Sequence, residues 1–259
     1  GFTGDNISNT TIDNVVMVGN LSLSANGIYL ANSSDLTLTN NTITVGGDYG
    51  IYSNESDNSV VNNNTITGSY STTIEMRDCD NCHFEGNTLS GNTVLQLEYS
   101  NSLVIHDNHV LDHYSGFQLY QCDSAQVTSN EIIKPTSSMF GMNINQFIYN
   151  ESSSSTLIED NVFSVEDGNN TDNSSWKIQS FQSVIRNNSF IMDINHEYWR
   201  HWNIIRANES VISENTFSIV SNVYIYLKVL ETEGSENNRS VVENNIININ
   251  TYYPSFQSG

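Results

Sequence analysis

The chain of 259 residues has little positive charge, little proline and little cysteine. Its 8 Lys and Arg stand against 29 Asp and Glu, a net charge of −21. This balance excludes a nucleic-acid groove or an anionic membrane surface as the expected partner, because both attract clustered cations. No apolar run approaches the roughly 18 residues that span a bilayer. The chain begins at Gly1 without a methionine or a signal peptide, so we expect a processed or cut N-terminus.

Short polar residues dominate instead. The sequence has 39 Asn, 36 Ser and 20 Thr, together 95 of 259 residues. A disordered chain can be this polar, but 37% apolar residues, 10% aromatic residues and only 2 Pro favour a β-rich fold with many Asn turns. The length suits one elongated domain or two compact ones.

A short motif, apolar-x-x-Asn-x-apolar, repeats along the chain at spacings of 21 to 31 residues. We call its asparagine the anchor, and the residues three before and two after it are apolar in all nine clear copies. The spacing predicts a solenoid in which equivalent residues stack about 4.8 Å apart, apolar positions face inward and the anchor bends the chain in a left-handed conformation. A degraded copy lies at Asn14. The nine clear anchors are Asn41, Asn64, Asn87, Asn108, Asn130, Asn161, Asn188, Asn215 and Asn245.

A second strand precedes the early anchors by about 12 residues and a third follows each anchor, which predicts three strands per coil. Segments such as GIYLANSSDLTLTNNTITVGG resemble the right-handed parallel β-helix repeat family. That family includes pectate-lyase-like proteins, NosD-type repeats and archaeal adhesin-like, surface-layer and sheath proteins. The resemblance implies an all-β, single-stranded right-handed parallel β-helix of nine to ten coils with an Asn ladder. We expect one domain over 1–259, with regular short coils at 10–133 and longer loop excursions at 134–250.

The outward side chains of the second strand form the first candidate site. Tyr and amide side chains on a flat β-face suit sugar binding, and paired Glu75 and Glu98 with Arg77 are the candidate catalytic residues of a hydrolase. Solvated carboxylates without a role are the alternative. The pectate-lyase-like enzymes that this chain resembles use a comparable face with clustered Asp for calcium, and that cluster is missing here. The two outward rows are Tyr29, Tyr52, Glu75, Gln96, Gln118 and, two residues further on, Arg77, Glu98, Tyr120.

A histidine cluster is the candidate metal site, since imidazole binds divalent transition metals. It consists of His106, His109 and His113. The anchor Asn108 places a bend between the first two, so solvated turn histidines are the alternative. We therefore expect no metal and no other cofactor.

The three cysteines are Cys79, Cys82 and Cys122. Cys79 and Cys122 occupy equivalent positions two coils apart, roughly 10 Å, which is beyond disulfide reach. Cys82 is expected in the core. The Cys-x-x-Cys spacing leaves open a disulfide or redox pair between Cys79 and Cys82.

Thirteen Asn-x-Ser/Thr sequons are candidate glycosylation sites, against roughly eight expected from composition alone. By-products of Asn turns are the alternative explanation. No sequon begins within 64–149, which indicates a glycan-free region. The sequons are Asn6, Asn9, Asn20, Asn32, Asn40, Asn54, Asn63, Asn150, Asn169, Asn173, Asn187, Asn208 and Asn238.

Three functional hypotheses follow. The first is a secreted, non-catalytic structural or adhesive surface protein, N-glycosylated and self-assembling into a cell-surface layer, sheath or filament. The second is a carbohydrate-active β-helix enzyme, a polysaccharide lyase or glycoside hydrolase, and the third is a glycan-binding module. The expected partners are other copies of the chain, through the solenoid ends or faces, and glycans. Nucleic acid and a membrane span are not expected.

Overall fold

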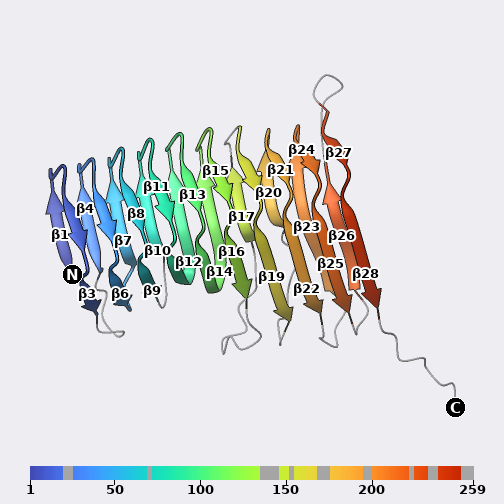
Figure 1. The fold of residues 1–259 in the computed structure, drawn as a ribbon, viewed down its shortest axis with the longest axis horizontal. Helices are drawn as coiled ribbons and strands as arrows, with labels where there is room; N and C mark the ends of the chain where they lie inside the picture. The colour runs from blue at the N-terminus through green and yellow to red at the C-terminus, as the bar shows by residue number, and fades with distance from the viewer. Residues whose placement is uncertain are drawn as a thin grey trace, which may run out of the picture.

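The computed structural model describes residues 1–19, 26–68, 72–134, 146–151, 155–167, 176–194, 200–221, 225–232 and 239–251. These residues wind into a stack of coils in which each strand pairs in parallel with its equivalents in the neighbouring coils (Figure 1). The prediction of an all-β parallel β-helix with three strands per coil is confirmed. Within the described ranges there is no helix that could cross a membrane.

The strands form three sides of the solenoid, and the second side is a sheet of ten short strands. The first side contains β1 (Phe2–Asp5), β4 (Ile28–Ala31), β7 (Tyr49–Asn54), β10 (Thr72–Arg77), β17 (Gln146–Glu151), β20 (Trp176–Phe181), β23 (Arg200–Asn208) and β26 (Ile225–Glu231). The second contains β2 (Thr11–Asp13), β5 (Thr37–Thr39), β8 (Val60–Asn62), β11 (His83–Glu85), β13 (Val104–His106), β15 (Gln126–Thr128), β18 (Leu157–Glu159), β21 (Val184–Arg186), β24 (Val211–Ser213) and β27 (Val241–Glu243).

The third side leads into the first side of the next coil. It contains β3 (Val16–Val18), β6 (Thr42–Val45), β9 (Thr65–Gly68), β16 (Glu131–Lys134), β19 (Val162–Asp167), β22 (Ser189–Ile194), β25 (Thr216–Ser221) and β28 (Ile246–Thr251). Two strands, β12 (Thr88–Glu98) and β14 (His109–Tyr120), run without a break from the third side to the first side of the next coil. Most loop residues of 134–250 lie outside the described residues.

The core is a set of apolar ladders, one residue per coil. From the coil of Asn41 to that of Asn215, residues three before the anchors, such as Phe84, Ile105 and Val127, are fully buried, and so are the residues two after them. On the third side these include Phe163, Phe190 and Phe217, whose rings stack at centroid distances of 4.9 and 4.7 Å. Like residues repeat at each level because a side chain on one coil packs mainly on its equivalents above and below. Both predicted inward positions are confirmed.

The anchor asparagines form a buried hydrogen-bonded ladder beside this core. The Oδ1 atom of Asn108 accepts from the backbone N–H of Asn87 at 3.1 Å and from its Nδ2 at 2.9 Å. The Nδ2 of Asn108 donates to the carbonyl of Phe84 at 2.9 Å and to Oδ1 of Asn130 at 2.9 Å. The same pattern continues from Asn41 to Asn245. Each amide therefore satisfies polar groups that no water reaches.

The predicted left-handed bend lies one residue earlier than the anchor, so that prediction is wrong in detail. The residues that precede the anchors have positive φ, for example Asn40 at 55°, Asn63 at 53° and Asp107 at 52°. Their side chains point to solvent, and the reversal turns the following amide inward. The degraded copy is corrected in the same way. Asn14 takes the left-handed position, with φ of 54°, and Val15 takes the anchor position, where its N–H donates to Oδ1 of Asn41 at 3.0 Å.

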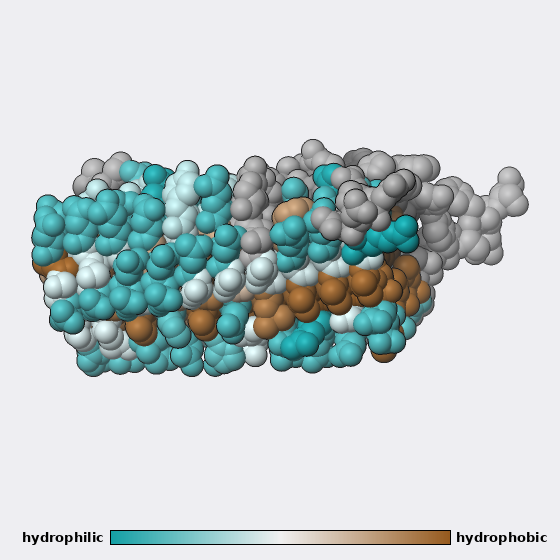
Figure 2. Space-filling model, turned by 90° about the horizontal axis from the view of Figure 1, so that it is seen from above, coloured by the Kyte–Doolittle hydropathy of each residue, from teal (hydrophilic) through white to brown (hydrophobic). Residues whose placement is uncertain are grey.

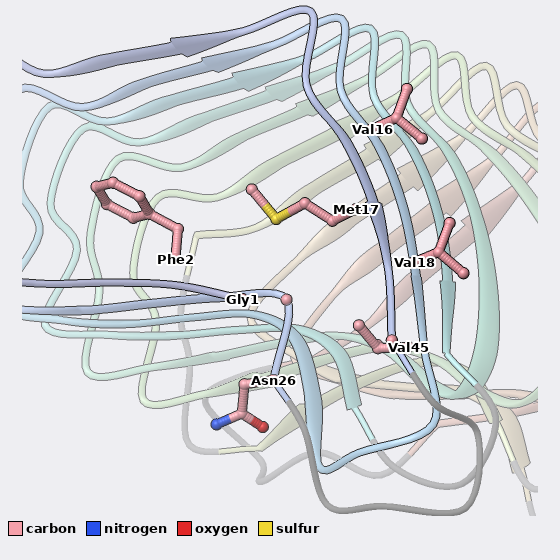
Figure 3. Close-up of a pocket in the computed structure, with 9 residues that line it drawn as sticks. Gly1, Phe2, Val16, Met17, Val18, Asn26 and Val45 are labelled. Atoms are coloured by element: carbon pink, nitrogen blue, oxygen red, sulfur yellow. The ribbon is translucent and has the colours of Figure 1, made fainter.

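The core is open at both described ends. On the last described coil, the ladder residues Val242 and Ile247 are 47% and 45% exposed. At the first coil a cavity of about 390 Å³ opens beside β1 and β3. Phe2 and Met17 point into this opening, whereas Val16 points away from it (Figure 3). The cavity is the open end of the core ladders, and we assign it no ligand.

Asn108→Ala tests the ladder. We expect the variant to lose about 2–6 kcal/mol of unfolding free energy, because two buried groups, the carbonyl of Phe84 and the N–H of Asn87, lose a partner at roughly 1–3 kcal/mol each. The matched control is Asn101→Ala, because Asn101 is exposed and its side-chain hydrogen bonds, from Nδ2 to Asp80 at 3.1 Å and from the N–H of Asp123 to Oδ1 at 3.3 Å, can be replaced by water. Denaturant titration measures both. Equal midpoints for the two variants would contradict a structural role for the buried amides.

Candidate functional site

The predicted outward rows exist on the first side of the solenoid. The register of β7, β10 and β12 aligns Tyr52 with Glu75 and Gln96, and Arg77 with Glu98. Tyr29 on β4 aligns with Tyr52. Residues from four coils that are distant in sequence therefore form one surface, because alternate residues of a strand point outward and parallel pairing keeps them in line. We call this the Tyr52–Arg77 surface, formed by Tyr29, Tyr49, Tyr52, Glu75, Arg77, Gln96 and Glu98.

Three tyrosines form one end of this surface. The rings of Tyr29 and Tyr52 stack at 4.9 Å with an interplanar angle of 13°. Tyr49, on the same strand as Tyr52, lies against it at 4.9 Å with a tilt of 49°. Because the rings stack along the solenoid axis, they present edges and hydroxyl groups to solvent. Tyr29 is 37% exposed and has only Thr3 in register on its other side, so one aromatic face is accessible.

Arg77 joins the two candidate catalytic carboxylates. Its Nη2 lies 2.8 Å and its Nε 2.9 Å from Oε1 of Glu75, and Nε also lies 3.1 Å from Oε2 of Glu98. Gln96 donates to Oε1 of Glu98 at 2.6 Å. The carboxylate pair is therefore balanced by a single cation, and its oxygens are engaged by side chains of the same surface.

Glu75 is an unusual residue for an outward row, because it is only 3% exposed. Burial raises the pKa of its carboxyl above the ordinary value of 4.5, and the charge of Glu98 raises that pKa further. The guanidinium of Arg77 and a hydrogen bond from Tyr49 oppose the rise. Burial also raises the pKa of the Tyr49 and Tyr52 hydroxyl groups, which therefore remain protonated donors at neutral pH.

Arg77 occupies the space between the two carboxylates that a hydrolase would need for its substrate. A glycosidase holds the scissile bond between its two carboxyl groups. Here the guanidinium of Arg77 lies between Glu75 and Glu98, and Glu75 is covered. What the surface offers is a set of fixed hydroxyl, amide and guanidinium groups beside aromatic rings, which matches the mixed polar and apolar surface of a sugar.

Tyr49 is the residue of this surface that the sequence analysis missed. It lies three residues before Tyr52, and the outward alternation alone does not place it beside Tyr52. Gly50 separates it from the inward Ile51, so the strand is irregular at this point. The one sign of this contact in the sequence is a second tyrosine, Tyr49, three residues before the outward Tyr52.

Among the described side chains no group of three metal-binding residues occurs, and the side chain of His113 lies outside them. His106 bonds Thr128 on the second side, with Nδ1 3.0 Å from Oγ1. His109 begins the third side and lies 2.7 Å from Glu131. His113 lies further along β14, where its backbone pairs with Gly91. The bend at the anchor separates the first two, as its position in the sequence predicts.

Cys79 and Cys82 form a disulfide within one turn, with their Cα atoms 5.9 Å apart, and both are fully buried. They occupy core positions that serine fills in other coils, for example Ser56 and Ser59. Cys122 is a buried thiol outside the disulfide, and burial raises its pKa to about 11, so it is protonated at neutral pH.

The sequons divide by exposure. Six have an exposed asparagine with positive φ on the turns: Asn6, Asn9, Asn32, Asn40, Asn63 and Asn187. Asn54 and Asn208 are half-buried at the ends of β7 and β23, and Asn150 lies in β17. The remaining four, Asn20, Asn169, Asn173 and Asn238, lie outside the described residues.

An apolar stripe runs along the outer face of the second side (Figure 2). It consists of Leu157, Val184, Val211 and Val241, which are consecutive partners in the sheet register. In the earlier coils polar residues interrupt the same row, for example His83 and Gln126. The stripe is confined to the coils from β18 onward.

Arg77→Met tests the carboxylate cluster. Without the cation, the pKa of buried Glu75 rises further, so the folded state binds the proton more tightly than the unfolded state. Stability is then lost as pH rises from 4.5 through the folded-state pKa. We expect a loss of about 1–3 kcal/mol near neutral pH and a much smaller loss near pH 4. Denaturant titration at both pH values measures it, and adding Glu75→Gln should flatten the difference. A loss independent of pH would contradict the assignment.

The fold is shared with proteins of different function. PfbA, a surface adhesin of Streptococcus pneumoniae, matches with a TM-score of 0.60 and 15% identity over 96% of this chain and 71% of that chain. DFA-IIIase from Arthrobacter chlorophenolicus A6, without its lid and in complex with GF2, matches with a TM-score of 0.60 and 14% identity over 90% of this chain. This chain spans 65% of that enzyme's length. At these identities the likeness shows the fold alone.

No curated protein matches the sequence. The family model of the right-handed β-helix region matches residues 1–163. The matched part contains the second-side strands from β2 to β18 and the whole Tyr52–Arg77 surface. The chain belongs to the right-handed β-helix family.

Proposed function

We propose that this protein is a non-catalytic, extracellular surface protein that adheres to carbohydrate through the Tyr52–Arg77 surface. The observation that carries the proposal is the Glu75–Arg77–Glu98 cluster, in which both carboxylates are held by one guanidinium. Fixed donors and acceptors beside stacked tyrosines give a preformed contact surface that loses little entropy on binding. The similar fold of the PfbA adhesin supports this class of function.

The proposed ligand class is a neutral saccharide. With both glutamates ionised, the Glu75–Arg77–Glu98 cluster carries one net negative charge, and the whole chain carries −21. A uronic acid polymer would be repelled by that field. Neutral sugars accept and donate hydrogen bonds without that penalty.

An extracellular location is supported by three features. The buried disulfide Cys79–Cys82 persists in an oxidising compartment. Six sequon asparagines are exposed on turns, where glycans can project into solvent. The acidic surface keeps a long solenoid soluble.

A glycoside hydrolase is the second candidate function. It is favoured by the raised pKa of Glu75, since a general acid must hold its proton near neutral pH. The DFA-IIIase fold supports this alternative. For catalysis, Arg77 would have to leave the space between the carboxylates when substrate binds.

Self-association is a further part of the proposal. In the described part of the chain, the edge formed by β27 and β28 exposes Val242 and Ile247, which continue ladders that are buried in the preceding coils. A second copy that adds its β2 and β3 to this edge would extend the parallel pairing already present between all coils. The stacked form would be a filament because the two edges are different surfaces.

Saccharide binding by Tyr52→Ala tests the adhesive function. We expect binding to a panel of neutral oligosaccharides that weakens about tenfold in the variant, a loss of roughly 1.4 kcal/mol. Tyr99→Ala is the matched control, because Tyr99 is 52% exposed on a turn outside the outward rows. Calorimetry measures the affinities, and incubation with DFA-III, GF2 and polygalacturonate followed by product analysis measures turnover. Absence of binding would refute adhesion, and released product would establish the hydrolase instead.

Ile247→Lys tests self-association. The side chain is 45% exposed, so the folded monomer should tolerate the change, while a charge at the edge should prevent stacking. We expect sedimentation of the wild type to show assemblies that dissociate on dilution, and the variant to remain monomeric. A wild-type monomer at every concentration would reject the filament.

A further inference from the structure

Asn54 lies inside the Tyr52–Arg77 surface, unlike the other described sequon asparagines. It is the partner of Arg77 in the register of β7 and β10. It also follows Tyr52 by two residues on β7, so both side chains point outward on the same strand. Its outward neighbours are therefore Tyr52 along the strand and Arg77 across it, at the strand spacing of about 4.8 Å.

The folded coil can also accommodate a sugar on the Asn54 amide without losing a hydrogen bond. Other sequon asparagines donate their Nδ2 to an aspartate of the preceding coil: Asn32 to Asp5 and Asn40 to Asp13, each at 2.9 Å. Within the described part of the chain, the side chain of Asn54 makes no hydrogen bond, although it is half-buried. A sugar attached to this amide therefore breaks no side-chain hydrogen bond of the folded coil.

We propose that Asn54 carries an N-linked glycan whose first sugars lie over Tyr52 and Arg77, so that occupancy of Asn54 controls access to the saccharide-binding surface. The control of saccharide access rests on the proposed function, whereas the glycan on Asn54 does not depend on it. It deepens that function by giving the surface two competing occupants, the protein's own glycan and an external saccharide.

The attachment requires an activated donor, an oligosaccharide linked through phosphate to a lipid. The Asn54 Nδ2 forms a bond to the anomeric carbon, the bond from that carbon to the phosphate oxygen breaks, and the amide loses one proton. The sequon hydroxyl belongs to Ser56, which is fully buried and lies against Ser53 in the folded coil. Transfer therefore precedes closure of this coil, and the attached glycan stays at the surface when the coil closes.

The side chains around Asn54 direct the glycan toward Arg77. The neighbour on the other coil is Ala31, which has no polar group to bond a sugar. Arg77 is 40% exposed and keeps guanidinium N–H groups toward solvent, and the Tyr52 hydroxyl lies in the adjacent outward row. The sugar hydroxyls therefore find their partners on the side of the carboxylate cluster.

The first experiment measures coverage of Arg77. The full chain is produced in a host that N-glycosylates, as wild type and as Asn54→Gln, and peptide mass spectrometry gives the occupancy of each sequon. An arginine-selective dicarbonyl reagent is then applied, and the rates at Arg77 and Arg186 are followed. We expect Asn54 to be occupied and Arg77 to react several-fold more slowly in the wild type than in Asn54→Gln, with Arg186 unchanged. Asn32→Gln is the matched control, since Asn32 lies on the neighbouring turn, and it should leave the Arg77 rate unchanged.

An unoccupied Asn54 beside occupied sequons such as Asn32, or equal Arg77 rates in both proteins, would overturn the inference. The absence of glycan at every sequon would overturn it too.

The second experiment measures the consequence. The same proteins are titrated with the neutral oligosaccharide panel, and we expect Asn54→Gln to bind several-fold more tightly than the glycosylated wild type. If Arg77 is covered but no form binds saccharide, the modification stands and the proposed function fails. If all forms bind equally while Asn54 is occupied, the control of access fails and the proposed function stands.

Discussion

The buried amide of the anchor asparagine is the interaction on which the rest of the molecule depends. From the coil of Asn64 onward, each amide accepts two hydrogen bonds from the anchor of the preceding coil and donates to a carbonyl of that coil, as Asn64 does to Leu38. A solenoid turn bends the backbone and leaves polar groups inside that no strand can pair. From Asn41 onward these groups are satisfied by a side chain that has both a donor and an acceptor and stacks on its own equivalents. The spacing between anchors can vary, because loops elsewhere in each coil contain the extra residues. The hydrogen-bonded turn at the anchor keeps the same form.

This constraint frees the outward rows to vary. Because the ladder fixes the register, residues of adjacent coils align in the outward rows whatever their chemistry. One row thus changes from Tyr29 and Tyr52 to Glu75 and Gln96 within four coils, and a row on the second side changes from His83 to the apolar stripe that begins at Leu157. Function on such a scaffold is a matter of which side chains become neighbours, and neighbours come from residues about twenty positions apart.

The fold followed from the sequence because its signal is periodic: the apolar positions three before and two after each anchor are buried from Leu38 to Phe217. The bend was misplaced by one residue because Asn fits both the left-handed position and the buried amide position. The pairs Asn40-Asn41 and Asn63-Asn64 look alike in sequence, and only pairing shows which side chain points inward. For the same reason the sequence does not show that Val15, rather than Asn14, takes the anchor position.

In the site, the outward rows are predictable from the alternation of residues along a strand. The burial of Glu75 and the contact of Tyr49 with Tyr52 are not predictable in this way. Both depend on the irregular strand at Gly50 and on side chains from neighbouring coils.

Glu75 is an exception to the regular pattern of the solenoid, in which outward side chains are solvated. An outward position on a solenoid should be solvated, yet this carboxylate is 3% exposed and is covered by Tyr49 and Arg77. Replacing a buried ion pair by apolar side chains of similar size is often neutral or stabilising, so stability alone does not explain its presence. In the following coils the same outward row contains neutral residues, Gln96 and Gln118, in place of a carboxylate. The free-energy cost of burying the Glu75 carboxylate therefore falls on the Tyr52–Arg77 surface. The tyrosines stack on this same surface, and the sequon asparagine Asn54 lies within it. Local departures of this kind are expected at functional sites. The coincidence of the three on adjacent coils, rather than the shape of the solenoid, is the physical basis for assigning function here.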